Sequence, residues 1–113
     1  ETMSLDIHLY ATDTDGNEIG VYDDNTTHNL NMMADKAGVY EALWRPETKG
    51  WTKAGELIDT LETGLADLKA RQEYFEEFNP ANGWGDYDGL VRFVSNYLDA
   101  CKKYPSTKVS VSR

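Results

Sequence analysis

Cysteine, histidine and proline are scarce in this sequence, and long apolar runs are missing. The single cysteine, Cys101, excludes an internal disulfide and fits a reducing compartment. With two histidines and no CxxC or HExxH spacing, no zinc site is recognisable, and we predict neither a metal nor a cofactor. The apolar runs are only a few residues long and no secretory signal is recognised, so we expect no membrane span and a cytoplasmic location.

Basic residues are also few. The chain has 11 Lys and Arg residues against 20 Asp and Glu residues, a formal net charge of −9. This balance argues against direct nucleic-acid binding, which depends on neutralising phosphates with Lys and Arg. Two interpretations remain: ordinary solubility, which charge alone favours, or a basic partner such as a protein whose nucleic-acid groove accepts an acidic surface.

The composition is that of one globular domain. The 113 residues are enough for a single modest core, and we expect one domain over residues 1–113. Hydrophobic residues make up 40% and aromatic residues 12% of the chain, which argues against disorder. Glu1 and Thr2 precede Met3, and we expect them to be remnants of an expression vector.

The best-specified segment is a predicted helix over 87–103. Asp86 or Asp88 can cap its start, where a carboxylate accepts free backbone N–H groups. Cys101 lies on its apolar stripe, so we predict a buried structural thiol rather than a nucleophile. The stripe recurs at three- and four-residue spacing and consists of Tyr87, Leu90, Val91, Val94, Leu98 and Cys101.

Three segments are expected to be strands, near 5–12, 18–22 and 107–112. Alternation of apolar and polar residues indicates the first and the last, and the Asp15–Gly16 pair predicts a hairpin turn between the first two. The last strand needs a partner, and only the hairpin offers one. We therefore expect a three-stranded antiparallel sheet with the C-terminal strand beside the first strand.

The turn also resembles a calcium-binding loop faintly. Asp13, Asp15 and Asn17 stand at alternate positions, but Gly16 falls at the fourth position of such a loop instead of the sixth, and Asp24 replaces the bidentate Glu. Turn chemistry is the better interpretation.

The rest of the chain predicts helices. The Asp24–Thr27 cluster predicts a helix start near Thr27, and Thr52 is expected to cap a later helix. The predicted fold is α+β, with the small sheet packed against four to five helices. The helices before the one at 87–103 are expected near 27–37, 39–44, 53–69 and 71–78.

No motif identifies a reaction. The sequence has no GxSxG elbow, no phosphate-binding P-loop and no cysteine placed for catalysis, so we choose no catalytic residue and favour a protein that is not an enzyme. Residues for binding are easier to choose, because Trp, Tyr and Arg most often provide binding energy at interfaces. His28 and Asn29 add hydrogen-bonding groups at a helix start, where the helix dipole favours a neutral imidazole. The candidate binding residues are His28, Asn29, Trp44, Arg45, Trp84 and Tyr87.

Each candidate also has an ordinary structural explanation. His28 and Asn29 can simply be polar residues at a helix start. Trp44 and Trp84 can be large apolar side chains that close the core, although Gly83 and Gly85 frame Trp84 in a turn that packing alone would not favour.

Several motifs together resemble a family of small bacterial and phage or prophage proteins of uncharacterised function. The resemblance covers almost the whole chain, and the Asp13–Glu18 hairpin departs most from it. It implies a phage setting and a host bacterial cytoplasm. The motifs are Thr27-His28-Asn29-Leu30, Gly38-Val39-Tyr40, Leu43-Trp44-Arg45-Pro46-Glu47, Asn79-Pro80, Asn82-Gly83-Trp84-Gly85, Leu90-Val91-Arg92-Phe93-Val94, Tyr97-Leu98-Asp99-Ala100-Cys101 and Val109-Ser110-Val111-Ser112-Arg113.

Two functional hypotheses follow. The first is a non-enzymatic, acidic interaction protein, a phage-derived inhibitor in the manner of anti-CRISPR and other anti-defence proteins. It would bind a host protein that handles nucleic acid, by analogy with small acidic phage proteins. The alternative is a small-ligand-binding protein or minor enzyme with a pocket near His28, Asn29, Arg45 and Trp84, which would require a deep cavity there.

Overall fold

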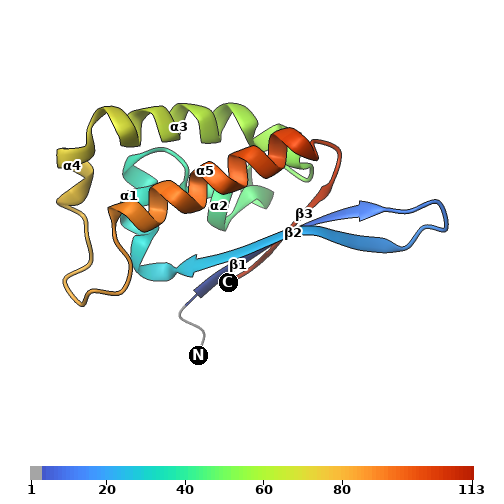
Figure 1. Cartoon of the computed structure of the whole chain (residues 1–113), viewed down its shortest axis with the longest axis horizontal. Coiled ribbons are helices and arrows are strands. Elements are labelled where there is room, and N and C mark those ends of the chain that lie inside the picture. Colours follow the sequence, from blue (N-terminus) through green and yellow to red (C-terminus); the bar gives the residue numbers. More distant parts are fainter. Residues whose placement is uncertain (1–3) are drawn as a thin grey trace.

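The chain folds into a three-stranded antiparallel sheet with all its helices packed on one face (Figure 1). A computed structural model describes residues 4–113, so the expected vector remnant, Glu1 and Thr2, lies outside the described residues. The strands are β1 (Ser4–Thr12), β2 (Glu18–Thr27) and β3 (Lys108–Ser112), in the order β2-β1-β3. This confirms the predicted α+β fold and the position of the C-terminal strand beside the first.

The alternation seen in the sequence decides which face of β1 is buried. Leu5, Ile7 and Leu9 are fully buried under the helices, whereas Asp6 and His8 point to the opposite, open face. The hairpin turn is organised by Asp13, whose carboxylate oxygen Oδ1 accepts the backbone N–H groups of residues 15 and 17 at 2.8 Å each. These hydrogen bonds, first the one from Asn17, lower the pKa of Asp13.

The long helix α5 (Tyr87–Lys103) has the predicted bounds. Asp86 caps it by accepting the N–H of Gly89 at 2.7 Å, and Lys102 and Lys103 lie in its last turn, where the dipole favours cations. Cys101 is fully buried as predicted, and burial raises the pKa of its thiol to about 12. The other helical elements are η1 (His28–Leu30), α1 (Asn31–Lys36), α2 (Tyr40–Trp44), η2 (Pro46–Lys49), η3 (Ala54–Leu57), α3 (Ile58–Ala70) and α4 (Gln72–Glu76).

Several predicted boundaries were wrong. β2 continues to Thr27 because Asp24–Thr27 pairs with the start of β1, so the predicted cluster of helix caps lies in a strand. Only Thr27 acts as a cap, accepting the N–H of Asn29 at 3.2 Å, and the helix predicted over 27–37 is divided into η1 and α1. The helix predicted over 71–78 ends at residue 76.

The start of the α3 region also differs from the prediction. The side chain of Thr52 does not cap it. Instead, the Glu56 carboxylate oxygen Oε1 accepts the N–H groups of both Thr52 and Lys53 at 2.9 Å. These bonds, first the one from Lys53, lower the pKa of Glu56.

The hairpin extends past the helices. Figure 1 shows its turn end standing clear of the helical layer, which lengthens the molecule to 48 × 32 × 22 Å. Residues from Thr14 to Gly20 are all exposed. We call β1, the turn and β2 (residues 4–27) the hairpin arm.

Candidate functional site

Two of the predicted binding residues are joined directly. The indole Nε1 of Trp44 donates a 2.8 Å hydrogen bond to Nδ1 of His28. Because the indole nitrogen is only a donor, this imidazole nitrogen is unprotonated. Trp44 is only 3% exposed, so the His28 acceptor satisfies a buried polar group and the pair fixes η1 against α2.

Aromatic stacking connects this pair to Arg45. The Tyr40 ring is stacked on Trp44 with centroids 5.6 Å apart, and the Tyr40 hydroxyl accepts a hydrogen bond of 3.3 Å from Nε of Arg45. The backbone carbonyl of Trp44 accepts a 2.9 Å bond from Arg113, whose guanidinium also pairs with Glu47 at 3.3 Å. Arg45 itself is exposed, at the outer end of this chain of contacts.

Asn29 and Trp84 form a second, separate contact. The Asn29 amide lies 3.5 Å from the backbone carbonyl of Trp84, and Gly85 packs so closely on Leu30 that an added Cβ would lie 3.0 Å from the Leu30 Cγ. The positive φ angles of Gly83 (76°) and Gly85 (92°) fit the turn that glycine permits. The Trp84 side chain is 66% exposed, so the turn presents it to solvent.

Tyr87 belongs to the core rather than to a surface. It is 5% exposed, its hydroxyl donates a 2.7 Å hydrogen bond to the Leu68 carbonyl, and its N–H donates at 2.7 Å to the Asn79 side chain. Burial is the main cause that raises its pKa. The structure thus separates the six candidates: Arg45 and Trp84 are exposed, His28 and Asn29 are half-buried, and Trp44 and Tyr87 are buried.

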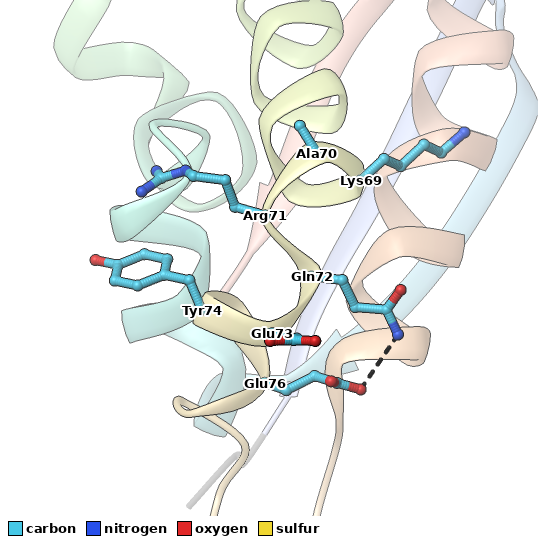
Figure 2. A pocket seen from close by; sticks show the side chains of 7 residues that line it. All are labelled: Lys69, Ala70, Arg71, Gln72, Glu73, Tyr74 and Glu76. Atoms are coloured by element: carbon cyan, nitrogen blue, oxygen red, sulfur yellow. Dashed lines mark hydrogen bonds between the residues drawn. The ribbon is translucent and has the colours of Figure 1, made fainter.

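An open cavity lies between the end of α3 and the start of α4 (Figure 2). Its volume is about 580 Å³. Two of its charged groups have partners within the protein. Arg71 makes two hydrogen bonds of 2.7 and 2.8 Å to Asp67 and lies 4.5 Å above the Tyr74 ring, and Glu76 accepts a 3.3 Å hydrogen bond from Gln72. The bonds from Arg71 lower the pKa of Asp67. The lining residues are Lys69, Ala70, Arg71, Gln72, Glu73, Tyr74 and Glu76, which include none of the predicted binding residues.

The distribution of charge along the chain is the strongest feature of the surface. Residues 1–35 contain eight of the 20 acidic residues and none of the 11 Lys and Arg residues. The remaining 78 residues contain 12 acidic and 11 basic residues and are close to neutral. Residues 1–35 therefore account for eight of the nine net negative charges, and six of these lie in the hairpin arm.

The fold turns this run of acidic residues into a surface. Asp6 pairs with Asn25 and His8 with Asp23 across β1 and β2, which places these four side chains on the open face of the sheet. They line, together with residue 24, a shallow hollow of about 230 Å³. Beside it the rings of His8 and Tyr10 are stacked with centroids 5.7 Å apart.

Few cations balance this surface. Lys108 of β3 reaches Glu18 at 3.2 Å, and no other ion pair found among residues 4–113 involves the hairpin arm. The total charge of the sequence does not reveal this surface. The signal that would have revealed it is the lack of any Lys or Arg before Lys36.

The comparisons with known proteins add no family. No protein-family model, no curated protein and no solved structure matches this chain. In the part of the chain that the structure describes, no helix is both long enough and apolar enough to span a membrane. No cluster of three or more His, Cys, Asp or Glu side chains within residues 4–113 is arranged to hold a metal ion.

Proposed function

We propose that this protein is a non-enzymatic inhibitor that binds a basic, nucleic-acid-binding surface of another protein. The observation that carries this proposal is the concentration of negative charge on the hairpin arm, which has six acidic residues and no Lys or Arg and whose turn end stands clear of the helical layer. Charge used only for solubility needs no such segregation, since dispersed charges keep a protein soluble equally well.

Complementary charge explains the choice of partner. A surface that binds nucleic acid carries clustered Lys and Arg side chains. The carboxylates of Asp6, Asp15 and Asp23 take part in none of the ion pairs found among residues 4–113, so they attract such a surface and speed the encounter. The same charge repels nucleic acid itself, so direct binding to DNA or RNA is not part of the proposal.

The biological setting of the proposal comes from the sequence resemblance. In a phage or prophage, a small protein of this kind would act in the host bacterial cytoplasm against a protein that handles nucleic acid, including a defence nuclease. It inhibits by occupying the surface that the nucleic acid needs.

The alternative, a ligand pocket near His28, Asn29, Arg45 and Trp84, has weaker support. His28 and Arg45 lie in one chain of contacts, and Asn29 and Trp84 meet in another. None of these four residues lines the cavities of 580 or 230 Å³ described above. We therefore propose only the interaction function.

Affinity capture tests the proposal. The tagged protein is incubated with a bacterial lysate, captured proteins are identified by mass spectrometry, and the main one is purified for a binding assay with competing duplex DNA or RNA. We expect a nucleic-acid-binding protein whose complex with this protein and whose complex with nucleic acid exclude one another.

A charge-matched pair of variants locates the contact. Asp6→Asn, Asp15→Asn and Asp23→Asn together neutralise the arm, and Glu41→Gln, Glu73→Gln and Glu77→Gln remove equal charge from the helices. The arm variant should bind at least tenfold more weakly than the helix variant, with less dependence on salt. Equal loss in both variants, or a captured protein that binds no nucleic acid, would sink the proposal.

A further inference from the structure

β2 is an edge strand with an open side. In the order β2-β1-β3, β1 is its only strand partner among residues 4–113, so the other side of its backbone has no strand beside it. Proteins usually protect such an edge with Pro, Lys or a covering element. The ten residues of β2 include neither Pro nor Lys, and the register shift at Val21 lies before the regular pairing of Tyr22 to Thr27, so the edge of this later part is available for pairing.

A groove runs along this edge, between β2 and α5. It has a volume of about 570 Å³ and is lined by residues 21–24 of β2 and, from α5 and the residue after it, Asn96, Asp99, Ala100, Lys103 and Tyr104. The Tyr22 ring in the groove is held in place by stacking on the buried Tyr97 ring, with centroids 6.1 Å apart and planes within 9° of parallel. The groove is therefore supported by the core and does not need to form on binding.

The groove is acidic. Asp23 and Asp24 border it on the strand side and Asp99 on the helix side. The one cation in the lining is Lys103, whose ammonium lies 5.3 Å from the centroid of the Tyr104 ring. The Asp23 side chain points to the open face, so Asp24 and Asp99 are the carboxylates of the groove, and these two against one ammonium favour basic side chains in a bound segment.

We propose that an extended Lys- or Arg-rich segment of the partner adds to the free edge of β2 as a fourth strand and places alternate side chains in the β2–α5 groove. This inference rests on the proposed function, because it names the surface that meets the basic partner. Main-chain hydrogen bonds to β2 supply register, and the groove carboxylates supply the preference for basic residues.

The pairing has a defined end. The N–H of Asn25 donates to the Asp24 carboxylate oxygen Oδ1 at 2.8 Å, so this donor is already occupied. The added strand therefore pairs with the residues before it, from Val21 to Asp24, which are the residues that border the groove.

An acetylated, amidated peptide of alternating Lys and Thr is the probe. It is titrated into the ¹⁵N-labelled full chain, and amide shifts and hydrogen exchange are recorded. We expect shifts and new protection at amides of β2 and shifts at Asp99. A second peptide carries N-methyl groups on alternate residues, which keeps every charge but removes one row of backbone donors. It should bind at least tenfold more weakly.

Matched variants of the protein distinguish the effect of a groove carboxylate from the effect of net charge. Asp99→Asn removes a groove carboxylate without altering β2 and should weaken binding of the unmodified peptide about threefold. Glu77→Gln removes the same charge from an exposed position after α4 and should leave binding unchanged.

Equal binding of the two peptides, without new protection in β2, would overturn strand addition. Shifts confined to the open face around Asp6 and His8 would also overturn it. In either case, loss of partner capture by the neutralised arm would leave the proposed function standing. Conversely, a peptide that pairs with β2 while captured proteins bind no nucleic acid would remove the proposed function alone.

Discussion

Gly64 lies where α3 meets the turn between α1 and α2, and replacing it with Ala should destabilise the protein. A Cβ at this position would lie 2.2 Å from Val39 Cγ1 and 2.9 Å from the Ala37 carbonyl oxygen. Carbon atoms in contact are normally about 3.5–4.0 Å apart, so the first distance is short by more than about 1 Å. A neighbour must move before the methyl group fits.

The neighbours are poorly able to move. Val39 is fully buried, and its N–H donates a 2.9 Å hydrogen bond to the Ala34 carbonyl at the end of α1. The turn also needs Gly38, whose φ is 78°. Overpacking of this kind costs about 1–3 kcal/mol, and the backbone oxygen places this site near the upper end. The higher helix propensity of Ala adds about 1 kcal/mol of stability, so the free energy of unfolding should fall by about 2 kcal/mol in all.

Urea and thermal unfolding followed by circular dichroism measure the effect. For a domain of this size, about 2 kcal/mol should lower Tm by about 8–12 °C. Thr63→Ala, at the exposed neighbouring position of α3, is the control and should be neutral or slightly stabilising. In the Val39→Ala background, Gly64→Ala should lower the free energy of unfolding by less, and a double-mutant cycle should give an interaction energy of about 1 kcal/mol between the two sites. A rise in stability of about 1 kcal/mol for Gly64→Ala alone would refute the close packing.

Three further predictions concern individual side chains. Cys101 should resist thiol reagents in the native state. Its folded-state pKa is raised to about 12, so the folded state holds the thiol proton more tightly than the unfolded state. The free energy of unfolding should therefore fall between about pH 9 and pH 12, by at most ~1.4 kcal/mol per pH unit from this thiol. His28→Ala should cost about 1–3 kcal/mol in urea unfolding, since it leaves the buried Trp44 donor unpaired. Trp84→Ala and Arg45→Ala should each barely change Tm, because both residues are exposed.

Each of these has a clear contrary outcome. Rapid labelling of Cys101 under native conditions would place it outside the core, and Cys101→Ala should flatten the alkaline loss of stability if the linkage is right. An unchanged unfolding midpoint for His28→Ala would mean that Trp44 finds another acceptor. A large fall in Tm for Trp84→Ala would make Trp84 a structural residue.

The bounds of α5 could be predicted because the information is local. The apolar stripe, the Asp86 cap and the two lysines at the end all lie within the helix or next to it. The strand order was also within reach, since a single C-terminal strand had only the hairpin to pair with. The end of β2 was not, because the Asp24–Thr27 segment has the composition of a helix start and becomes a strand only by pairing with Ser4–Ile7.

The same distinction applies to the predicted binding residues. The exposure of Trp84 follows from its local setting between two glycines. The burial of Trp44 and Tyr87 does not, because their polar atoms find partners 16 and 19 residues away, at His28 and Leu68. A large aromatic residue with a polar atom suits a surface or a core equally well, and only the tertiary partner decides between them.

The acidic surface shows how sequence order and fold act together. A net charge of −9 is compatible with evenly spread carboxylates, and the order of residues shows only that the first 35 lack Lys and Arg. The fold gathers these carboxylates into a surface, because antiparallel pairing brings Asp23 beside His8 and near Asp6, while the helices cover the other face. It also brings Asp99, which is 75 residues beyond Asp24, to the groove at the free edge of β2. A partner of the kind proposed would therefore meet a charged surface with a direction, set by a strand, and not a uniformly acidic protein.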